Sequence, residues 1–234
     1  MDFNFHTIPT GEYLVGMDPA DEMALELESP QFQCFLTQFT ISDLITFAQW
    51  QQFVKDSGYE ADGARYLDGP SETIALHEAP VTGVSKHDVD MFCKYYNVLL
   101  PTEAQWEVAA TQLGFPLGKY WEWTAEMFLP ERNSIFADRV ERTGYAVTDP
   151  YVPFPPDGVC KGLEKYWSTI GSTRGCGPMW LRFHNLYRFP LSKHTARRHE
   201  CPVDARTPVL GFRVAQWQRP MNLWQQDTED ALFD

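Results

Sequence analysis

The sequence predicts an α+β fold, with helices in the first half of the chain and irregular sheet in the second. Of the 234 residues, 44% are hydrophobic and 15% are aromatic, which is enough for a sizeable core. The 17 Pro and 15 Gly are spread along the chain and indicate many turns and long loops rather than a helical bundle. Capped segments with an apolar helical face occur before Gly114, and beyond it we expect no further helix.

The N-terminal part predicts strands followed by a helix. Glu12–Met17 has the composition of a strand, and apolar and polar residues roughly alternate in Gln31–Ile41. Thr46 then begins a helix, because Gln49 stands three residues later in the capping-box position and Gly58 supplies a stop. The apolar face of this helix consists of Phe47, Trp50, Phe53 and Val54.

Two further helices carry the same start signal. Ser85 begins the first, with Asp88 three residues later, and the pattern stops near Asn97. Thr102 begins the second, with Gln105 as its capping partner. The side chains expected to face inward are Val89, Phe92, Tyr95 and Tyr96 in the first helix, and Trp106, Ala109 and Ala110 in the second.

The C-terminal half predicts little regular structure. Residues 130–173 are expected to be irregular, and Val209–Trp217 is the last predicted strand. We expect residues 1–217 to form one domain and residues 218–234 to be a polar, acidic tail.

Composition also indicates the cellular compartment of the protein. The first ten residues lack the basic and apolar regions of a signal peptide, and no apolar run is long enough to span a membrane. The five Cys are widely spaced without a CxxC pair, which argues against a zinc knuckle. A reducing, cytoplasmic location is therefore expected.

A basic strip stands out in this acidic chain. The forty residues from Arg174 to Arg213 carry eight Lys or Arg and only two acids, Glu200 and Asp204, although the whole chain has a net charge of −13. Aromatic side chains are interspersed, so the strip suggests a surface for an anionic, flat partner. The alternative is that these arginines pair with the protein's own acids. The overall acidity argues against general nucleic-acid binding.

Three motifs in fixed order carry a family resemblance. They are Ala79–Ser85 with the later LPTEAQWE block Leu100–Glu107, then Tyr120–Thr124 (YWEWT), and finally Gly211–Arg213 (GFR). Together they resemble the sulfatase-modifying-factor family, whose type member is the formylglycine-generating enzyme, over residues 10–216. The resemblance implies a C-type-lectin-like fold.

The type reaction of that family is not expected here. The resemblance implies a copper ion held by two thiolates that follow a Gly-Gly-Ser-Trp sequence, and the equivalent stretch is Arg174–Trp180. Arg182 and Tyr187 stand where the two cysteines would be, and neither offers the soft ligand that cuprous ion needs. A rebuilt copper or iron site would have to use Cys176, Cys201, Glu200 and the late histidines His184, His194 and His199.

The family's calcium site is also altered. The resemblance assigns Glu122 as one calcium ligand and an asparagine seven residues earlier as another, and that position is Phe115. Lys119 replaces the asparagine that usually precedes the WEW block. One carboxylate beside a lysine is a poor calcium site, so we expect no metal there.

These observations favour a non-catalytic ligand-binding protein. The same fold includes the variable proteins of diversity-generating retroelements, which place their variable residues between the Gly-Gly-Ser-Trp-like element and the GFR motif. The partner is expected to be a protein or a small anionic or aromatic ligand, and self-association through the basic strip is possible. A metal-dependent oxidative enzyme of the same family remains the alternative. The predicted binding face consists of Trp180, Arg182, Phe183, His184, Asn185, Tyr187, Arg188, Arg197, Arg198, His199 and Arg206.

Overall fold

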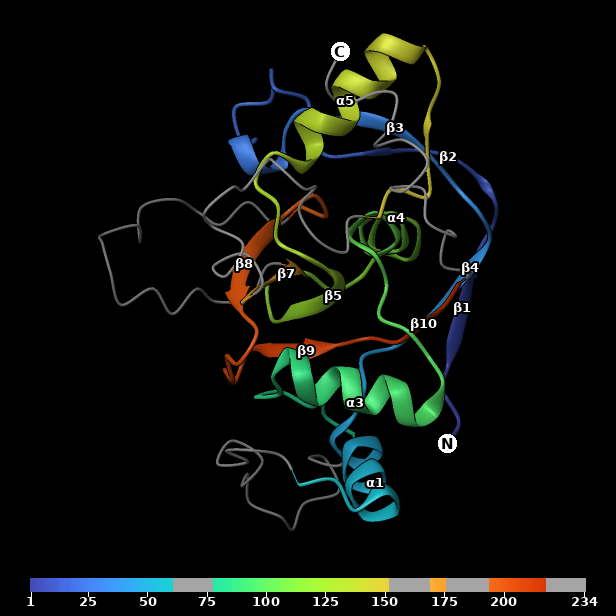
Figure 1. Ribbon diagram of the computed structural model, residues 1–234, viewed down its shortest axis with the longest axis vertical. Helices are drawn as coiled ribbons and strands as arrows, with labels where there is room; N and C mark the ends of the chain where they lie inside the picture. The colour runs from blue at the N-terminus through green and yellow to red at the C-terminus, as the bar shows by residue number, and fades with distance from the viewer. Residues whose placement is uncertain (61–77, 152–168, 176–193, 218–234) are drawn as a thin grey trace, which may run out of the picture.

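The structure is a computed structural model that describes residues 1–60, 78–151, 169–175 and 194–217 (Figure 1). Its helices are α1 (Phe47–Ser57), α3 (Lys86–Tyr96), α4 (Glu103–Leu113) and α5 (Arg132–Thr143), with a short 3-10 helix η1 (Glu26–Glu28). Its strands are β1 (Phe5–Ile8), β2 (Gly11–Val15), β3 (Phe32–Leu36), β4 (Phe39–Ser42), β5 (Trp121–Met127), β6 (Val147–Thr148), β7 (Ile170–Gly175), β8 (Arg198–Pro202), β9 (Leu210–Phe212) and β10 (Ala215–Gln216).

The strands form small sheets around the central helix α4. One sheet has the order β1-β4-β10 and a second the order β2-β3-β6. The sheet that concerns function has the order β8-β7-β5-β9, in which β5 pairs antiparallel with β7 and parallel with β9. Figure 1 shows α4 between this sheet and the β2-β3 hairpin, with α3 and α1 beyond β9 and α5 at the opposite end. The predicted α+β class is confirmed.

The three predicted helices are confirmed together with their caps. The side-chain oxygens of Thr46, Ser85 and Thr102 each accept a hydrogen bond from the backbone N–H three residues later. Each of these helices ends at a residue in the left-handed conformation, which is Gly58 for α1 and Asn97 for α3. The expectation that Tyr95 faces the core is wrong, because that side chain is 48% exposed.

The prediction that no helix follows Gly114 is wrong. Helix α5 covers Arg132–Thr143, although its N-cap residue Glu131 makes no side-chain capping bond. It is held instead by packing against β3, where the ring of Phe136 lies 5.3 Å from that of Phe32. The segment expected to be irregular therefore contains α5, β6 and β7.

Two hydrophobic clusters lie on opposite sides of α4 and the β5 sheet. The first joins α1 and α3 to the β5 sheet, and includes Trp50, Phe92 and Phe212. The second joins α4 and α5 to the β2-β3 hairpin, and includes Val108 and Phe136. Between these clusters, α4 presents its remaining face to the β5 sheet, which it contacts at β5 and β7.

The predicted strands are also present, with shifted bounds. Glu12–Met17 corresponds to β2, and Gln31–Ile41 divides into β3 and β4. Val209–Trp217 divides into β9 and β10. The predicted tail, residues 218–234, lies outside the described residues. Among the residues that are described, no helix combines the length and apolar character needed to cross a bilayer.

Candidate functional site

Strand β5 has two chemically different faces. Trp121 and Trp123 point into the first hydrophobic cluster, and Trp123 donates its indole N–H to the carbonyl oxygen of Val84. The alternating residues Glu122 and Glu126 are buried among polar partners instead. Because side chains alternate along a strand, this polar face of the sheet is turned toward α4. The candidate site is built on that face.

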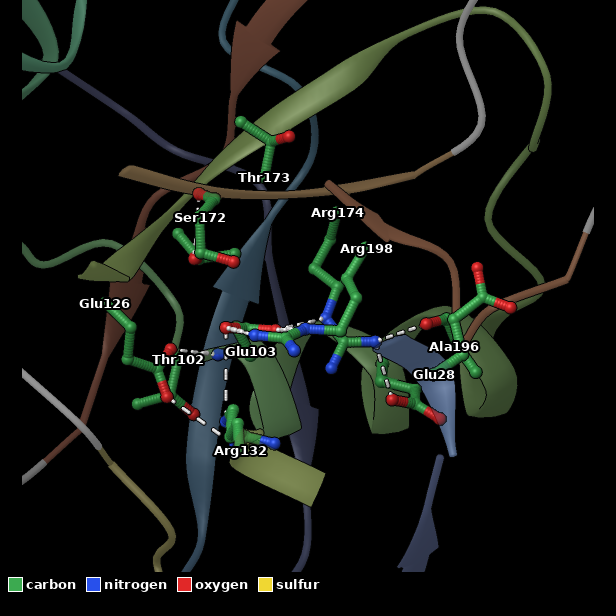
Figure 2. A network of polar contacts seen from close by, with 12 residues as sticks. Glu28, Thr102, Glu103, Glu126, Arg132, Ser172, Thr173, Arg174, Ala196 and Arg198 are labelled. Carbon is green, nitrogen blue, oxygen red and sulfur yellow. Dashed lines mark hydrogen bonds and ion pairs between the residues drawn. The ribbon is translucent and has the colours of Figure 1, made fainter. Parts of the chain in front are cut away.

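Helix α4 supplies two buried carboxylates to the site. Glu103 and Glu107 are four residues apart and therefore share one helix face. Arg198 of β8 donates from Nε and Nη2 to the two oxygens of Glu103, at 2.7 and 2.8 Å. Figure 2 shows Glu103 at the centre of the network, with Arg174 and Arg132 also directed toward it. A bidentate pair of this kind fixes orientation as well as charge.

Arg174 joins the two carboxylates of α4 to the loop before β8. Its Nε lies 3.1 Å from Oε2 of Glu103, and its Nη1 donates to Oε2 of Glu107 at 2.7 Å. The same Nη1 donates to the carbonyl oxygen of Ala196 at 2.9 Å. Glu107 in turn accepts a hydrogen bond from the backbone N–H of Gly16. Arg174 thus connects β7, α4 and the chain that leads into β8.

A third carboxylate, Glu126, connects the network to α5. Its Oε2 accepts a hydrogen bond from the backbone N–H of Glu103, and its Oε1 lies 3.5 Å from Nη2 of Arg132. Burial raises the pKa of Glu126 to about 7, against the lowering effect of Arg132. Burial would also raise the pKa of Glu103, but Arg198 and Arg174 outweigh it and hold that pKa well below its usual range.

Glu28 anchors the beginning of the last described segment. Its side chain is fully buried, and its Oε1 accepts from Nη1 of Arg197 at 2.8 Å. Nε2 of His194 lies 3.1 Å from the other oxygen of Glu28. The carbonyl oxygen of Glu28 accepts from the side-chain amide of Asn133 in α5. These contacts hold residues 194–197 against η1, and η1 against α5.

Both borders of the segment 176–193 are therefore held in place by buried ion pairs. Arg174 of β7 and Arg198 of β8 lie opposite each other in the antiparallel pairing of the two strands. The N–H of Gly175 donates to the carbonyl oxygen of Arg197. We call the set Glu28, Glu103, Glu107, Arg174, Arg197 and Arg198 the platform. It lies where residues 176–193 begin and end.

Three arginines of the predicted face have carboxylate partners inside the protein. Arg198 is 2% exposed and Arg197 is 8% exposed, and both are paired with glutamates inside the protein. Arg206 pairs with Asp88 at the start of α3 through both of its terminal nitrogens. The alternative of internal pairing thus describes the contacts of these three arginines, each of which is held by a buried carboxylate. The predicted face residues that lie outside the described residues are Trp180, Arg182, Phe183, His184, Asn185, Tyr187 and Arg188.

His199 keeps a position at the edge of the sheet. It is half-buried on β8, and its ring centroid lies 5.5 Å from that of Trp121. Cys201, two residues on, is also half-buried, and burial together with nearby Asp204 raises the pKa of its thiol to about 12. A nucleophilic or freely reactive cysteine needs the thiolate form, which this environment disfavours. The suggested partner of Cys201, Cys176, lies outside the described residues.

The residues at the family's calcium position do not fit a cation. One oxygen of Glu122 accepts from the indole N–H of Trp106 at 2.7 Å and from Nε of Arg213 at 2.9 Å. The guanidinium carbon of Arg213 lies 3.8 Å from the centroid of the Phe115 ring. A positive side chain thus already neutralises Glu122, and an aromatic ring stands in place of an oxygen ligand.

A separate hollow of about 510 Å³ lies between α3 and the end of β5. Val98, Leu100 and Met127 line it with apolar groups, while Lys86 and Asp90, which pair at 2.8 Å, contribute polar groups. It lies on α3, away from the platform, and its lining residues are not part of the predicted binding face.

Several members of the network were missed from the sequence. Glu28, Glu126 and Arg132 gave no signal, and Glu103 was noted only as part of the LPTEAQWE block Leu100–Glu107. The spacing of Glu103 and Glu107 was a usable signal, because two acids on one face of an otherwise apolar helix need buried partners. The basic strip was the other half of that signal.

The family of the chain follows from comparison with known proteins. Residues 4–218 match the model of the sulfatase-modifying factor enzyme 1-like domain. The chain belongs to this family. A mouse member of similar sequence, "Inactive C-alpha-formylglycine-generating enzyme 2", is 23% identical over 265 residues, which cover 89% of this chain and 84% of that protein. The predicted family is thus confirmed.

Solved structures confirm the fold of this sulfatase-modifying-factor domain. PvdO from Pseudomonas aeruginosa superposes with a TM-score of 0.61 at 15% identity, covering 90% of this chain and 93% of that one. Variable protein 1 of Treponema denticola superposes with a TM-score of 0.57 at 14% identity, covering 91% and 94%. The predicted C-type-lectin-like fold is therefore correct.

Proposed function

We propose that this member of the sulfatase-modifying-factor family is a non-catalytic binding protein that presents residues 176–193 from the platform. One observation carries the proposal: both borders of that segment are fixed by buried ion pairs of Arg174, Arg197 and Arg198. Rigid support at both ends lowers the entropy that a binding segment loses on complex formation. The aromatic and basic residues of the segment are the types that dominate binding energy at interfaces.

The proposed face is narrower than the sequence alone suggested. It consists of Trp180, Arg182, Phe183, His184, Asn185, Tyr187 and Arg188, with His199 at its border. In this proposal Arg197 and Arg198 support the face instead of contacting the ligand, and Arg206 pairs with Asp88 of α3. The proposed partner is a protein or a small molecule that offers an anionic or aromatic group, as the remaining arginines and aromatic side chains favour.

Two considerations favour binding over catalysis. Arg182 and Tyr187 replace the thiolates of the type reaction, and the thiol of Cys201 is held in its protonated form at neutral pH. A mouse relative of this chain bears the word "inactive" in its name, and a structure of the same fold is a variable protein. Both names are compatible with a family fold used without oxidation chemistry.

The face can be probed with 8-anilino-1-naphthalenesulfonate, a fluorescent ligand that is both anionic and aromatic. We expect Trp180→Ala and Arg182→Ala each to weaken its binding by about fivefold or more, since interface Trp and Arg contribute more than 1 kcal/mol when they anchor a ligand. Matched controls are Arg142→Ala, at an exposed position of α5, and Tyr145→Ala, whose side chain is 79% exposed. Equal dissociation constants for all four variants and the wild type would refute the proposed face.

Metal content separates this proposal from the oxidative alternative. After anaerobic incubation with copper(I) or iron(II) and desalting, we expect the protein to retain far less than one equivalent, because Arg182 and Tyr187 stand at the family's thiolate positions and the described residues hold no cluster of metal-ligating side chains. Elemental analysis provides the measurement. Retention near one equivalent, abolished by Cys176→Ala or His199→Ala, would instead support a rebuilt oxidative centre.

A further inference from the structure

The hollow between α3 and the end of β5 is lined along one face of a helix. The α3 residues Lys86, Asp90, Cys93 and Lys94 line it, together with Asn97 at the helix end. Their spacing places them one after another on the same side of α3. Because a helix rises 1.5 Å per residue, the stretch from Lys86 to Asn97 is about 16 Å long. The hollow is therefore an elongated groove, which suits a linear ligand better than a compact one.

Apolar groups form the other side of the hollow. Val98 and Leu100 follow α3 in the chain and are buried, while Ala125 and Met127 of β5 are half-buried. A volume of about 510 Å³ with a mainly apolar lining is typical of pockets that bind small molecules. A hydrocarbon chain placed there would remove these apolar groups from water, which favours binding.

The polar side of the hollow has one positive charge without a counter-ion. Nζ of Lys86 donates to Oδ1 of Asp90 at 2.8 Å, so these two charges neutralise each other. Lys94 is exposed and has no ion-pair partner among the residues that the structure describes. Asn97, also exposed, adds a side-chain amide as a second donor near Lys94. A ligand with one negative charge therefore matches the hollow, and a second negative charge would lack a partner.

The end of α3 makes Lys94 important for such a ligand. Asn97 ends the helix, and its backbone N–H bonds to the carbonyl oxygens of Cys93 and Lys94. The carbonyl end of a helix carries partial negative charge, which repels an anion unless a cation compensates for it. Lys94 is the basic residue of the last turn and supplies that cation.

We propose that this hollow binds a linear amphipathic monocarboxylate, such as a medium-chain fatty acid. The carboxylate would meet Lys94 and Asn97, and the hydrocarbon chain would lie along Val98, Leu100 and Met127. The hollow shares no lining residue with the face proposed above to bind a partner. The inference therefore goes beyond the proposed function and assigns a second, independent site.

Titration with octanoate tests the proposal, with backbone amide shifts in nuclear magnetic resonance spectra as the readout. We expect saturable shifts in residues 97–100 and at Met127. Hexanoate should bind about fivefold more weakly, because each buried methylene contributes about fourfold in affinity and the open hollow leaves part of the chain in water. Octylamine, which has the same chain and a positive charge at neutral pH, should bind at least about fivefold more weakly than octanoate.

The charge of Lys94 is tested separately. Lys94→Gln is expected to weaken octanoate binding by about fivefold, since it leaves the carboxylate facing the negative end of α3. Lys55→Gln is the matched control, because Lys55 is exposed in the last turn of α1 and does not line the hollow. Its dissociation constant should equal that of the wild type. Both lysines are exposed, so both variants are expected to fold.

Three results would overturn the assignment: equal dissociation constants for the wild type and Lys94→Gln, equal binding of octylamine and octanoate, or shifts confined to residues outside the hollow. If a second copy of the chain covered the hollow instead, sedimentation velocity would show a dimer that Lys94→Gln weakens, and the carboxylate assignment would be wrong. Equal naphthalenesulfonate binding by Trp180→Ala and its controls would count against the proposed function alone.

Discussion

Replacing Glu103 by Gln is expected to reduce the free energy of unfolding by about 3–5 kcal/mol, because it leaves buried arginines without their counter-ion. Glu103 accepts hydrogen bonds from both Nε and Nη2 of Arg198 and also pairs with Arg174. A glutamine amide would direct one N–H group toward a guanidinium that itself only donates. Urea denaturation at neutral pH provides the measurement.

The control for this substitution is Glu141→Gln, which removes the same charge from an exposed site on α5. Its effect should be within about 0.5 kcal/mol. The pH dependence supplies a second test. Because the pKa of Glu103 is lowered in the folded state, its contribution is complete above the unfolded pKa and is lost as pH falls below it. A Glu103→Gln protein as stable as the control at neutral pH would contradict the assignment.

Replacing Gly175 by Ala is expected to reduce stability by about 2–5 kcal/mol, the sum of backbone strain and steric overlap. Gly175 ends β7 with a φ of +114°, and a Cβ atom there would lie 2.6 Å from the carbonyl oxygen of Tyr120. That neighbour is backbone and cannot rotate away, so β7 and β5 would have to separate. The loss should appear as a lower midpoint of thermal unfolding, measured by circular dichroism.

Gly144→Ala is the matched control for this close approach. Gly144 has a φ of +72° at the end of α5, and a Cβ atom there meets nothing within 4 Å. Gly144→Ala should therefore lower the free energy of unfolding only through the backbone conformation, by about 1 kcal/mol. If both alanine variants unfolded at the same temperature, the close approach of Gly175 to Tyr120 would not explain any loss of stability.

Local signals explain why three helices were predicted and the fourth was missed. The starts of α1, α3 and α4 depend on a hydroxyl and a polar partner three residues later, which a short stretch of sequence displays completely. Helix α5 begins without a side-chain cap. Its position depends on Phe136 packing against β3 and on Arg132 meeting Glu126, both of which require the folded chain.

The ion pairs of the candidate site could be predicted only in part, for the same reason. Charge counting showed that arginines gather near the end of the chain, and it left internal pairing open as an alternative. Their partners are remote in sequence: Arg198 is 95 residues from Glu103, and Arg197 is 169 residues from Glu28. No local pattern assigns such pairs. Aromatic and basic composition identified a candidate face but did not separate arginines that support it from arginines available to a ligand.

The alternation of tryptophan and glutamate along β5 also protects the fold against misassembly. A slip of one residue in the pairing of β5 with β7 would exchange the two faces of the strand. Glu122 and Glu126 would then enter a cluster of aromatic rings, and Trp121 and Trp123 would face unpaired guanidinium groups. Such a misregistered chain would bury carboxylates in an apolar cluster on one side and leave guanidinium groups without partners on the other. The strand thus excludes its nearest competing alignment as well as favouring the native one.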